Sequence, residues 1–391
     1  MFKQTELNYN RAVFFLAALY VCFVFYSLAL SNISLGLSLF FFVVGLFKRK
    51  IELSFSGNTI KLYLLICTPF LLTLISVLNS YDTMYSLEFL WLRIPVFILP
   101  LVMLNLKHIE KKDFNYVFLL YLVATFLATG ISCYNAIKIY FEYGLFLDPN
   151  LTRDHITPIQ HPYYGIFTLI AIVTLYIYDS IIKQKKIRFF LLAFFSLGVV
   201  LSTSRIAILL LFLFLGYTIF SFFKNHKIYK FLILGCLGLI VFLSFSNTIL
   251  KTKIANTFSY WDSPRAWLWD NSYKIIKYSN HKLTGTGIGD FYRIKRSPEE
   301  FIHSQKGTYG YNPHNQYLEF LITNGIFGLL YMFTMLYLLY LSYKSKATYS
   351  VMIILIISVF SFTECIFNRQ FGVQLYSFFL PISLILATKK Q

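Results

Sequence analysis

Charged residues are scarce in this sequence. Asp, Glu, Lys and Arg make up 13% of its 391 residues, whereas an average soluble domain carries about 25%. Hydrophobic residues make up 57% of the chain and aromatic residues 20%. Such a composition leaves too little polar surface to coat a water-soluble globule. It predicts a single integral membrane domain over residues 1–391, with lipid as its solvent.

Cysteine and metal-binding motifs are scarce as well. All five cysteines lie inside apolar segments, which argues against a disulfide framework. The sequence has no H-E-x-x-H motif and no D-x-D pair, and His155 and His161 lie six residues apart with no evident third ligand. We therefore expect neither a metal nor another cofactor. The net charge of +18 comes from short clusters between apolar runs, so no nucleic acid partner is expected.

Apolar runs of roughly 17–25 residues, the length that crosses a bilayer, recur along the chain. They predict an all-α polytopic protein with about twelve transmembrane helices. The predicted spans are 12–31, 33–47, 60–78, 89–106, 114–133, 163–182, 188–204, 206–223, 229–247, 315–341, 349–367 and 372–387.

Lysine and arginine gather in the connections on the side of both termini. Those connections hold twenty of them, against four in the outer connections other than 248–313, a large loop whose ten do not count strongly because it is long. The positive-inside rule then predicts that both termini are cytoplasmic. Two long connections face the periplasm, a smaller loop at 134–162 and a large loop at 248–313, between spans nine and ten, that could act as a lid. The inner connections are too short for a catalytic domain, so the active site is predicted on the periplasmic face.

Arginines near the outer face are candidate anion-binding residues, because a charge inside a membrane costs free energy. Arg93 lies in F-L-W-L-R-I-P, Arg205 in L-S-T-S-R-I-A and Arg369 in N-R-Q-F-G. Snorkelling to lipid phosphates is the simpler reading for Arg93 and Arg369.

A capped helix is predicted in the large loop. Asp262 or Ser263 can cap it, and Pro264 fits its first turn. Arg265 enters at its N-terminus, where backbone N–H groups also favour anions, although by itself Arg265 is a surface arginine.

Two further motifs follow in the large loop and at its end. G-T-G-I-G-D-F at 285–291 has the spacing of turn glycines rather than of a nucleotide fingerprint. In N-P-H-N-Q-Y-L-E, Pro313 predicts a helix whose first turn holds His314 and Asn315, with Tyr317 on the face of His314. A histidine at this boundary is a candidate general base, or else a structural residue.

In this order and spacing, the T-S-R, Arg265, G-x-G-x-G-x-F and H-N-x-Y-L-E motifs resemble the O-antigen ligase and polymerase superfamily of bacterial envelope assembly. Ile206 departs from the pattern, because the family often has Gly there. The resemblance implies metal-independent transfer of a glycan from polyprenyl (undecaprenyl) pyrophosphate to an acceptor hydroxyl. That hydroxyl belongs to the lipid A core sugar in a ligase, to a second lipid-linked repeat unit in a polymerase, or to a protein. The H-N-Q-Y-L-E pattern and the modest length favour the ligase.

On this reading His314 is the base that takes the proton of the acceptor hydroxyl, and Arg205 and Arg265 hold the pyrophosphate. Further candidates for contacting the substrate are Arg93, Arg153, His161, Asn315, Tyr317 and Arg369. The protein is expected in the bacterial inner (cytoplasmic) membrane. The alternative from another class is a transporter or flippase of lipid-linked glycans, which would move the donor without forming a glycosidic bond.

Overall fold

A computed structural model describes residues 2–53, 56–107, 109–144, 155–222, 264–279, 281–293 and 312–388. The described residues form helices and no strand, which confirms the predicted all-α class. The predicted span 229–247, residues 248–263 and 294–311 of the predicted loop 248–313, and Arg153 lie outside the described residues.

The helices fall before and after the undescribed segment 223–263. Before it lie α1 (Phe2–Cys22), η1 (Phe23–Phe25), α2 (Leu28–Phe47), α3 (Gly57–Ile66), α4 (Thr68–Leu78), α5 (Thr83–Leu104), α6 (Lys111–Tyr143), α8 (His161–Ile177), α9 (Lys185–Leu201) and α10 (Arg205–Phe222). After it lie α13 (Pro264–Tyr278), α14 (Ile288–Arg293), α16 (Gln316–Asn324), η4 (Gly325–Gly328), α17 (Leu329–Lys344), α18 (Thr348–Ser361), η5 (Ile366–Asn368) and α19 (Gln370–Thr388).

Several of these helices are long and apolar enough to cross a membrane. Within the described residues there are five, or up to six if the bent pair α3 and α4 forms one span. Shorter apolar helices, α8 and α18 among them, coincide with further predicted spans. The helices therefore support a membrane protein, while the count of twelve spans stays a prediction.

Two predicted spans are broken helices. The stretch 60–78 bends by 61° between α3 and α4, where Pro69 lies in the first turn of α4 and has no N–H to continue the preceding helix. The stretch 315–341 divides at Gly325, whose φ of +58° takes the chain out of the helix before α17 begins. In addition, α6 continues to Tyr143, so the predicted loop 134–162 begins as helix.

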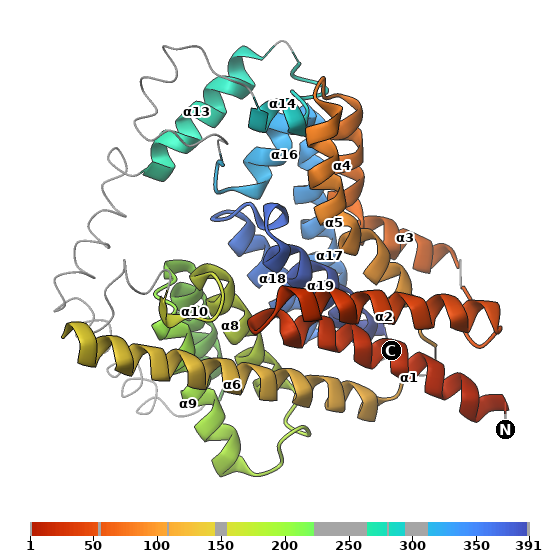
Figure 1. Cartoon of the computed structure of the whole chain (residues 1–391), viewed down its shortest axis with the longest axis vertical. Coiled ribbons are helices and arrows are strands. Elements are labelled where there is room, and N and C mark those ends of the chain that lie inside the picture. The colour runs from red at the N-terminus through yellow and green to blue at the C-terminus, as the bar shows by residue number, and fades with distance from the viewer. Residues whose placement is uncertain are drawn as a thin grey trace. The chain divides into compact units, whose positions relative to one another are not determined.

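The described chain divides into two compact units. Unit 1 comprises Met1–Ala124, Val173–Lys183 and Leu268–Gln391. In it α1 and α2 lie side by side, and α5 packs against α3, α4, α14 and α19 (Figure 1). Helix α5 therefore forms the centre of this unit, and it brings early and late parts of the chain together.

Unit 2 comprises Thr125–Ile172 and Gln184–Trp267. Its helices approach closely at small residues, as is common in membrane bundles. A Cβ atom on Gly198 would lie 3.0 Å from Thr129 Oγ1 and from the Tyr164 hydroxyl, which itself donates to Thr129 Oγ1 at 3.2 Å. These contacts join α6, α8 and α9 in a tightly packed core.

Candidate functional site

A buried arginine lies at the centre of unit 1. The Arg93 side chain on α5 is fully buried, and its Nη2 donates to Glu319 Oε1 at 2.7 Å. The guanidinium also donates to Thr73 Oγ1 at 2.7 Å, to the Phe367 carbonyl oxygen at 3.2 Å and to Asn368 Oδ1 at 2.7 Å. These bonds replace the hydration that burial removes. The guanidinium of Arg93, a residue predicted to contact substrate, is thus hydrogen-bonded to protein groups. These bonds favour a role for Arg93 in stabilising the packing of the site.

The carboxylate of Glu319 is equally enclosed, and four donors point at it. Oε1 accepts from Arg93 and from Gln316 Nε2 at 3.0 Å, and Oε2 accepts from the Tyr292 hydroxyl at 2.6 Å and from Asn368 Nδ2. Burial, together with the neighbouring carboxylate, raises the pKa of Tyr292 well above its usual value. The phenol therefore keeps its proton and remains a hydrogen-bond donor to Glu319.

This buried network joins five elements of unit 1: α4, α5, α14, α16 and η5. Phe367 N–H also donates to Gln316 Oε1 at 3.0 Å, which adds a direct bond between η5 and α16. The residue His314 lies just before α16, and Glu364 lies just before η5. The network therefore fixes the two chain segments that carry these side chains.

The glycine motif at 285–291 lies between α16 and the turn that joins α4 to α5. Gly285 and Gly287 both have a φ of +78°, and a Cβ atom would overlap the backbone of Thr323 at the first and Ser80 at the second. Thr286 N–H donates to the Ile322 carbonyl oxygen at 2.9 Å. The predicted turn glycines thus serve a close backbone approach, which places α14 and its Tyr292 against the network.

Helix α16 begins two residues later than the sequence predicts. Asn315 is its N-cap, and the Asn315 side chain accepts hydrogen bonds from the N–H groups of Tyr317 at 3.0 Å and Leu318 at 3.1 Å. The prediction that His314 and Asn315 lie in the first helical turn is therefore wrong, because the asparagine side chain terminates the helix there. Asn315, predicted to contact substrate, uses its side-chain oxygen as a cap.

His314 adopts an uncommon backbone conformation for a residue with a side chain. Its φ is +47°, and its N–H donates to Asn312 Oδ1 at 2.8 Å. Left-handed residues other than glycine cost free energy and concentrate at functional sites. Together with the cap at Asn315, this conformation turns the imidazole out of the helix.

The imidazole of His314 pairs with a carboxylate. His314 Nδ1 lies 3.0 Å from Glu364 Oε2, and the side-chain exposures are 39% for the histidine and 13% for the glutamate. A carboxylate at Nδ1 favours the tautomer that carries its proton there, so that Nε2 bears the lone pair. This arrangement suits a general base whose orientation is set by a fixed partner.

Helix α13 touches the same segment. The indole Nε1 of Trp269 donates to the carbonyl oxygen of Pro313 at 3.0 Å, one residue before His314. The helix begins at Pro264, in agreement with the prediction that proline occupies its first turn. Arg265 is exposed in that first turn, one helical turn before Trp269. Asp262 and Ser263, predicted as caps, lie outside the described residues.

The T-S-R motif forms the turn between α9 and α10 in unit 2. Thr203 is left-handed, with a φ of +48°, and Arg205 is the first residue of α10, with an exposed side chain. Ile206, where the family often has Gly, lies within α10, and the left-handed residue of this turn is Thr203. Arg205 thus lies at a helix N-terminus, where N–H groups and the helix dipole favour anions.

The remaining predicted residues have varied surroundings. The hydroxyl of Tyr317 donates to the Ser358 carbonyl oxygen at 3.1 Å, and its ring packs on Phe362 with centroids 4.5 Å apart. Arg369 is exposed and directly precedes α19, and His161 is half-buried at the start of α8. Unit 1 contains Arg93, His314, Asn315, Tyr317 and Arg369, and unit 2 contains His161, Arg205 and Arg265.

Sequence reasoning missed the two carboxylates that matter most here. Glu319 lies inside the predicted span 315–341 and Glu364 inside the predicted span 349–367. A carboxylate within a membrane span is costly unless it is paired. The free-energy cost of these two carboxylates was the signal available in the sequence, and it predicts basic or polar partners for both.

The fold and the site define a helical membrane protein with a buried ion-pair network beside a histidine–carboxylate pair. Residues 190–333 match the family model described as O-Antigen ligase. This match supports the resemblance of the sequence to the O-antigen ligase and polymerase superfamily. The segment contains Arg205, Arg265, His314 and Glu319 and supports an O-antigen ligase or polymerase-like function. No match was found among curated proteins.

Proposed function

We propose that this protein transfers a glycan from polyprenyl (undecaprenyl) pyrophosphate to an acceptor hydroxyl, with the lipid A core sugar as the acceptor. The observation that carries the proposal is the His314–Glu364 pair, with Nδ1 and Oε2 3.0 Å apart, whose histidine lies in the segment that matches the O-antigen ligase family. Histidine is a common general base, and this imidazole is partly exposed and oriented by Glu364.

The proposed reaction is an in-line displacement at the anomeric carbon of the donor. The acceptor oxygen forms the new glycosidic bond while the bond from that carbon to the pyrophosphate oxygen breaks. Nε2 of His314 takes the proton of the acceptor hydroxyl, and Glu364 stabilises the imidazolium that forms. The anomeric configuration is inverted, so a product with retained configuration would contradict this mechanism.

Arg205 and Arg265 are the proposed partners of the pyrophosphate. Negative charge develops on the leaving group in the transition state, and guanidinium groups placed there lower its free energy. Both arginines are exposed at the N-terminal end of a helix, which adds N–H donors of the right polarity. Two permanent cations would supply the charge that a divalent metal supplies in other glycan transfers.

The proposed location is the periplasmic face of the bacterial inner membrane. Its support is the excess of Lys and Arg in the connections on the side of both termini, twenty against four. On that orientation the T-S-R turn, α13, α14 and the start of α16 face the periplasm, where a flipped lipid-linked glycan and a lipid A core meet.

The test is reconstitution of the purified protein with undecaprenyl-pyrophosphate-linked glycan and lipid A core in EDTA. Transfer to core that persists in EDTA and collapses in His314→Ala and Arg265→Ala supports the proposal. Lengthening of the lipid-linked glycan without transfer to core would assign the chain to the polymerases. Movement of donor across the bilayer with no new glycosidic bond would refute the enzyme and favour the transporter.

A further inference from the structure

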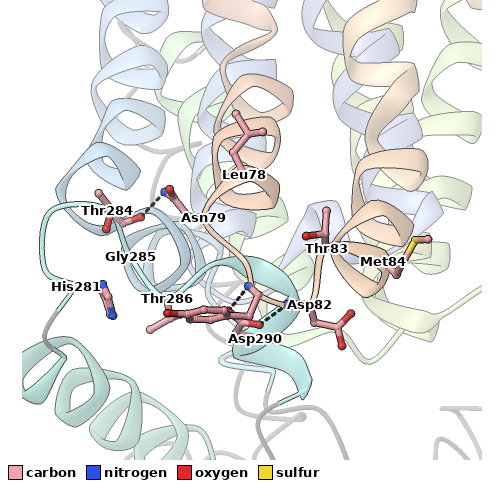
Figure 2. Close-up of a pocket in the computed structure, with 11 residues that line it drawn as sticks. Leu78, Asn79, Asp82, Thr83, Met84, His281, Thr284, Gly285, Thr286 and Asp290 are labelled. Atoms are coloured by element: carbon pink, nitrogen blue, oxygen red, sulfur yellow. Dashed lines mark hydrogen bonds between the residues drawn. The ribbon is translucent and has the colours of Figure 1, made fainter.

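A pocket with apolar and polar lining residues opens between the turn that joins α4 to α5 and the segment that leads into α14. It encloses about 1000 Å³. Figure 2 shows its lining residues, which include Asn79, Tyr81, Asp82, Met84, Thr284 and Asp290. All of them belong to unit 1. We name this cavity the α4–α5 pocket.

Hydrogen bonds between its two walls preform the α4–α5 pocket. The Asp290 carboxylate accepts from the N–H groups of Tyr81 and Asp82, both at 2.9 Å. Asn79 Nδ2 donates to the Thr284 carbonyl oxygen at 3.1 Å, and Gly289 N–H donates to Ser80 Oγ at 3.1 Å. A ligand entering such a pocket orders little of the protein, which favours binding.

The lining chemistry distinguishes between a sugar and a phosphate. Among the described residues that line the pocket there is no Lys or Arg, and two are aspartates. The carboxylates repel a phosphate and can accept hydrogen bonds from the hydroxyl groups of a sugar, while the Thr and Asn side chains can also donate to them. The lining therefore suits an uncharged, hydroxyl-rich ligand.

An aromatic ring at the pocket strengthens this assignment. Tyr81 is 95% exposed, and Met84 beside it is 80% exposed. The C–H face of a pyranose ring is apolar and packs well on the electron-rich face of an aromatic ring. A tyrosine held by its backbone N–H to Asp290, with its ring almost fully accessible, offers such a surface.

The α4–α5 pocket is connected to the buried network through α14. Asp290 holds the pocket turn, and Tyr292, two residues further on the same helix, donates to Glu319. In addition, Leu78 ends the bent apolar pair α3 and α4, so the pocket lies where a membrane span would end. A glycan carried on a membrane lipid would meet the protein at such a boundary.

We propose that the α4–α5 pocket is a glycan subsite that binds a neutral sugar ring remote from the bond being broken. The sugar would belong either to the donor glycan or to the acceptor oligosaccharide. This inference rests on the proposed function. Binding energy from remote sugars can be used to raise the transfer rate, so the subsite would also determine which glycans are transferred.

The test measures binding without turnover. Donor glycan is released from its carrier by mild acid, core oligosaccharide is prepared separately, and each is added to the detergent-solubilised full chain. Saturation-transfer NMR then reports contact and affinity. We expect one of the two sugars to bind wild type, about tenfold more weakly to Tyr81→Ala, and normally to Tyr81→Phe, which keeps the ring. The sugar that binds identifies the source.

The matched control is Tyr278→Ala, because Tyr278 is 74% exposed on α13 and does not line the pocket. Equal binding to Tyr81→Ala and Tyr278→Ala, or no binding of either sugar to wild type, overturns the subsite. Vesicles with undecaprenyl pyrophosphate lacking sugar provide a further arm, and weaker binding to them by Tyr81→Ala would show a phosphate site instead. Since no arm requires transfer, failure of the reconstituted reaction would count against the proposed function alone.

Discussion

Replacing Glu319 with glutamine should destabilise the protein strongly although the side chain keeps its shape. The Glu319 side chain is fully buried, and four donors point at its two carboxylate oxygens. An amide offers one oxygen and one NH2 group, so two of these donors would face another donor. The change also leaves the Arg93 guanidinium without its counter-charge.

The magnitude follows from these contacts. Removing one partner of a buried ion pair costs about 3–5 kcal/mol, because the remaining charge stays buried and unpaired. In a cycle of Arg93→Gln, Glu319→Gln and the double variant, the double variant should lose less than the sum of the two, with a coupling of about 1–3 kcal/mol. Glu52→Gln is the matched control. Its carboxylate lies 2.8 Å from Lys107 Nζ, against 2.7 Å in the buried pair, but both side chains are exposed, so the substitution should cost about 0–1 kcal/mol.

The assay is unfolding in mixed micelles titrated with SDS and followed by far-UV circular dichroism, with the transfer rate measured below the transition. Glu319→Gln should also slow transfer, because Glu319 holds α16 and η5, which carry the His314–Glu364 pair. A loss of unfolding free energy no larger than that of Glu52→Gln would refute the reasoning. Strict additivity in the double variant would refute the pairing.

Three further changes follow from the same geometry. Glu364→Gln should lower kcat about 10–100-fold with little change in KM, since it weakens the orientation of the His314 imidazole; a change in KM alone in steady-state kinetics would contradict this. Gly287→Ala should cost about 1–3 kcal/mol, because its φ is +78°, whereas Gly130→Ala, with open space around its Cβ, should cost nothing in the same unfolding titration. The pKa of Tyr292 is raised in the folded state, so its hydroxyl keeps its proton there, whereas in the unfolded chain the same hydroxyl titrates near 10.0. The free energy of unfolding should therefore decline as the pH rises above about 10. Tyr292→Phe should reduce the slope of that decline by up to about 1.4 kcal/mol per pH unit.

The helices were largely predictable because their signal is local. Apolar runs and prolines lie next to the residues whose conformation they decide, as at Pro264, where α13 begins as expected. The breaks at Pro69 and Gly325 were missed, because a run of apolar residues keeps its hydropathy whether or not its helix is continuous.

The site was predictable only in part because its contacts are distant in the chain. The motif around His314 was recognised from neighbouring residues, but its partner Glu364 lies 50 residues away. Arg93 was recognised as an expensive charge and was assigned to substrate, since nothing local to it reveals that Glu319 compensates it. Arg93 lies on α5 and Glu319 on α16, and only the packing of the early helices against the late ones brings them together.

The distance between Arg93 and Glu319 along the chain also bears on how the protein is made. The two residues are 226 positions apart, so the ribosome completes the arginine long before the glutamate. At about 5–20 residues per second, the nascent chain carries an uncompensated arginine in α5 for roughly 10–45 s. During that interval the early helices lack their final partner. A chain that is interrupted early keeps the Arg93 charge unpaired, whereas a finished chain pairs it with Glu319. The ion pair therefore distinguishes the two chains.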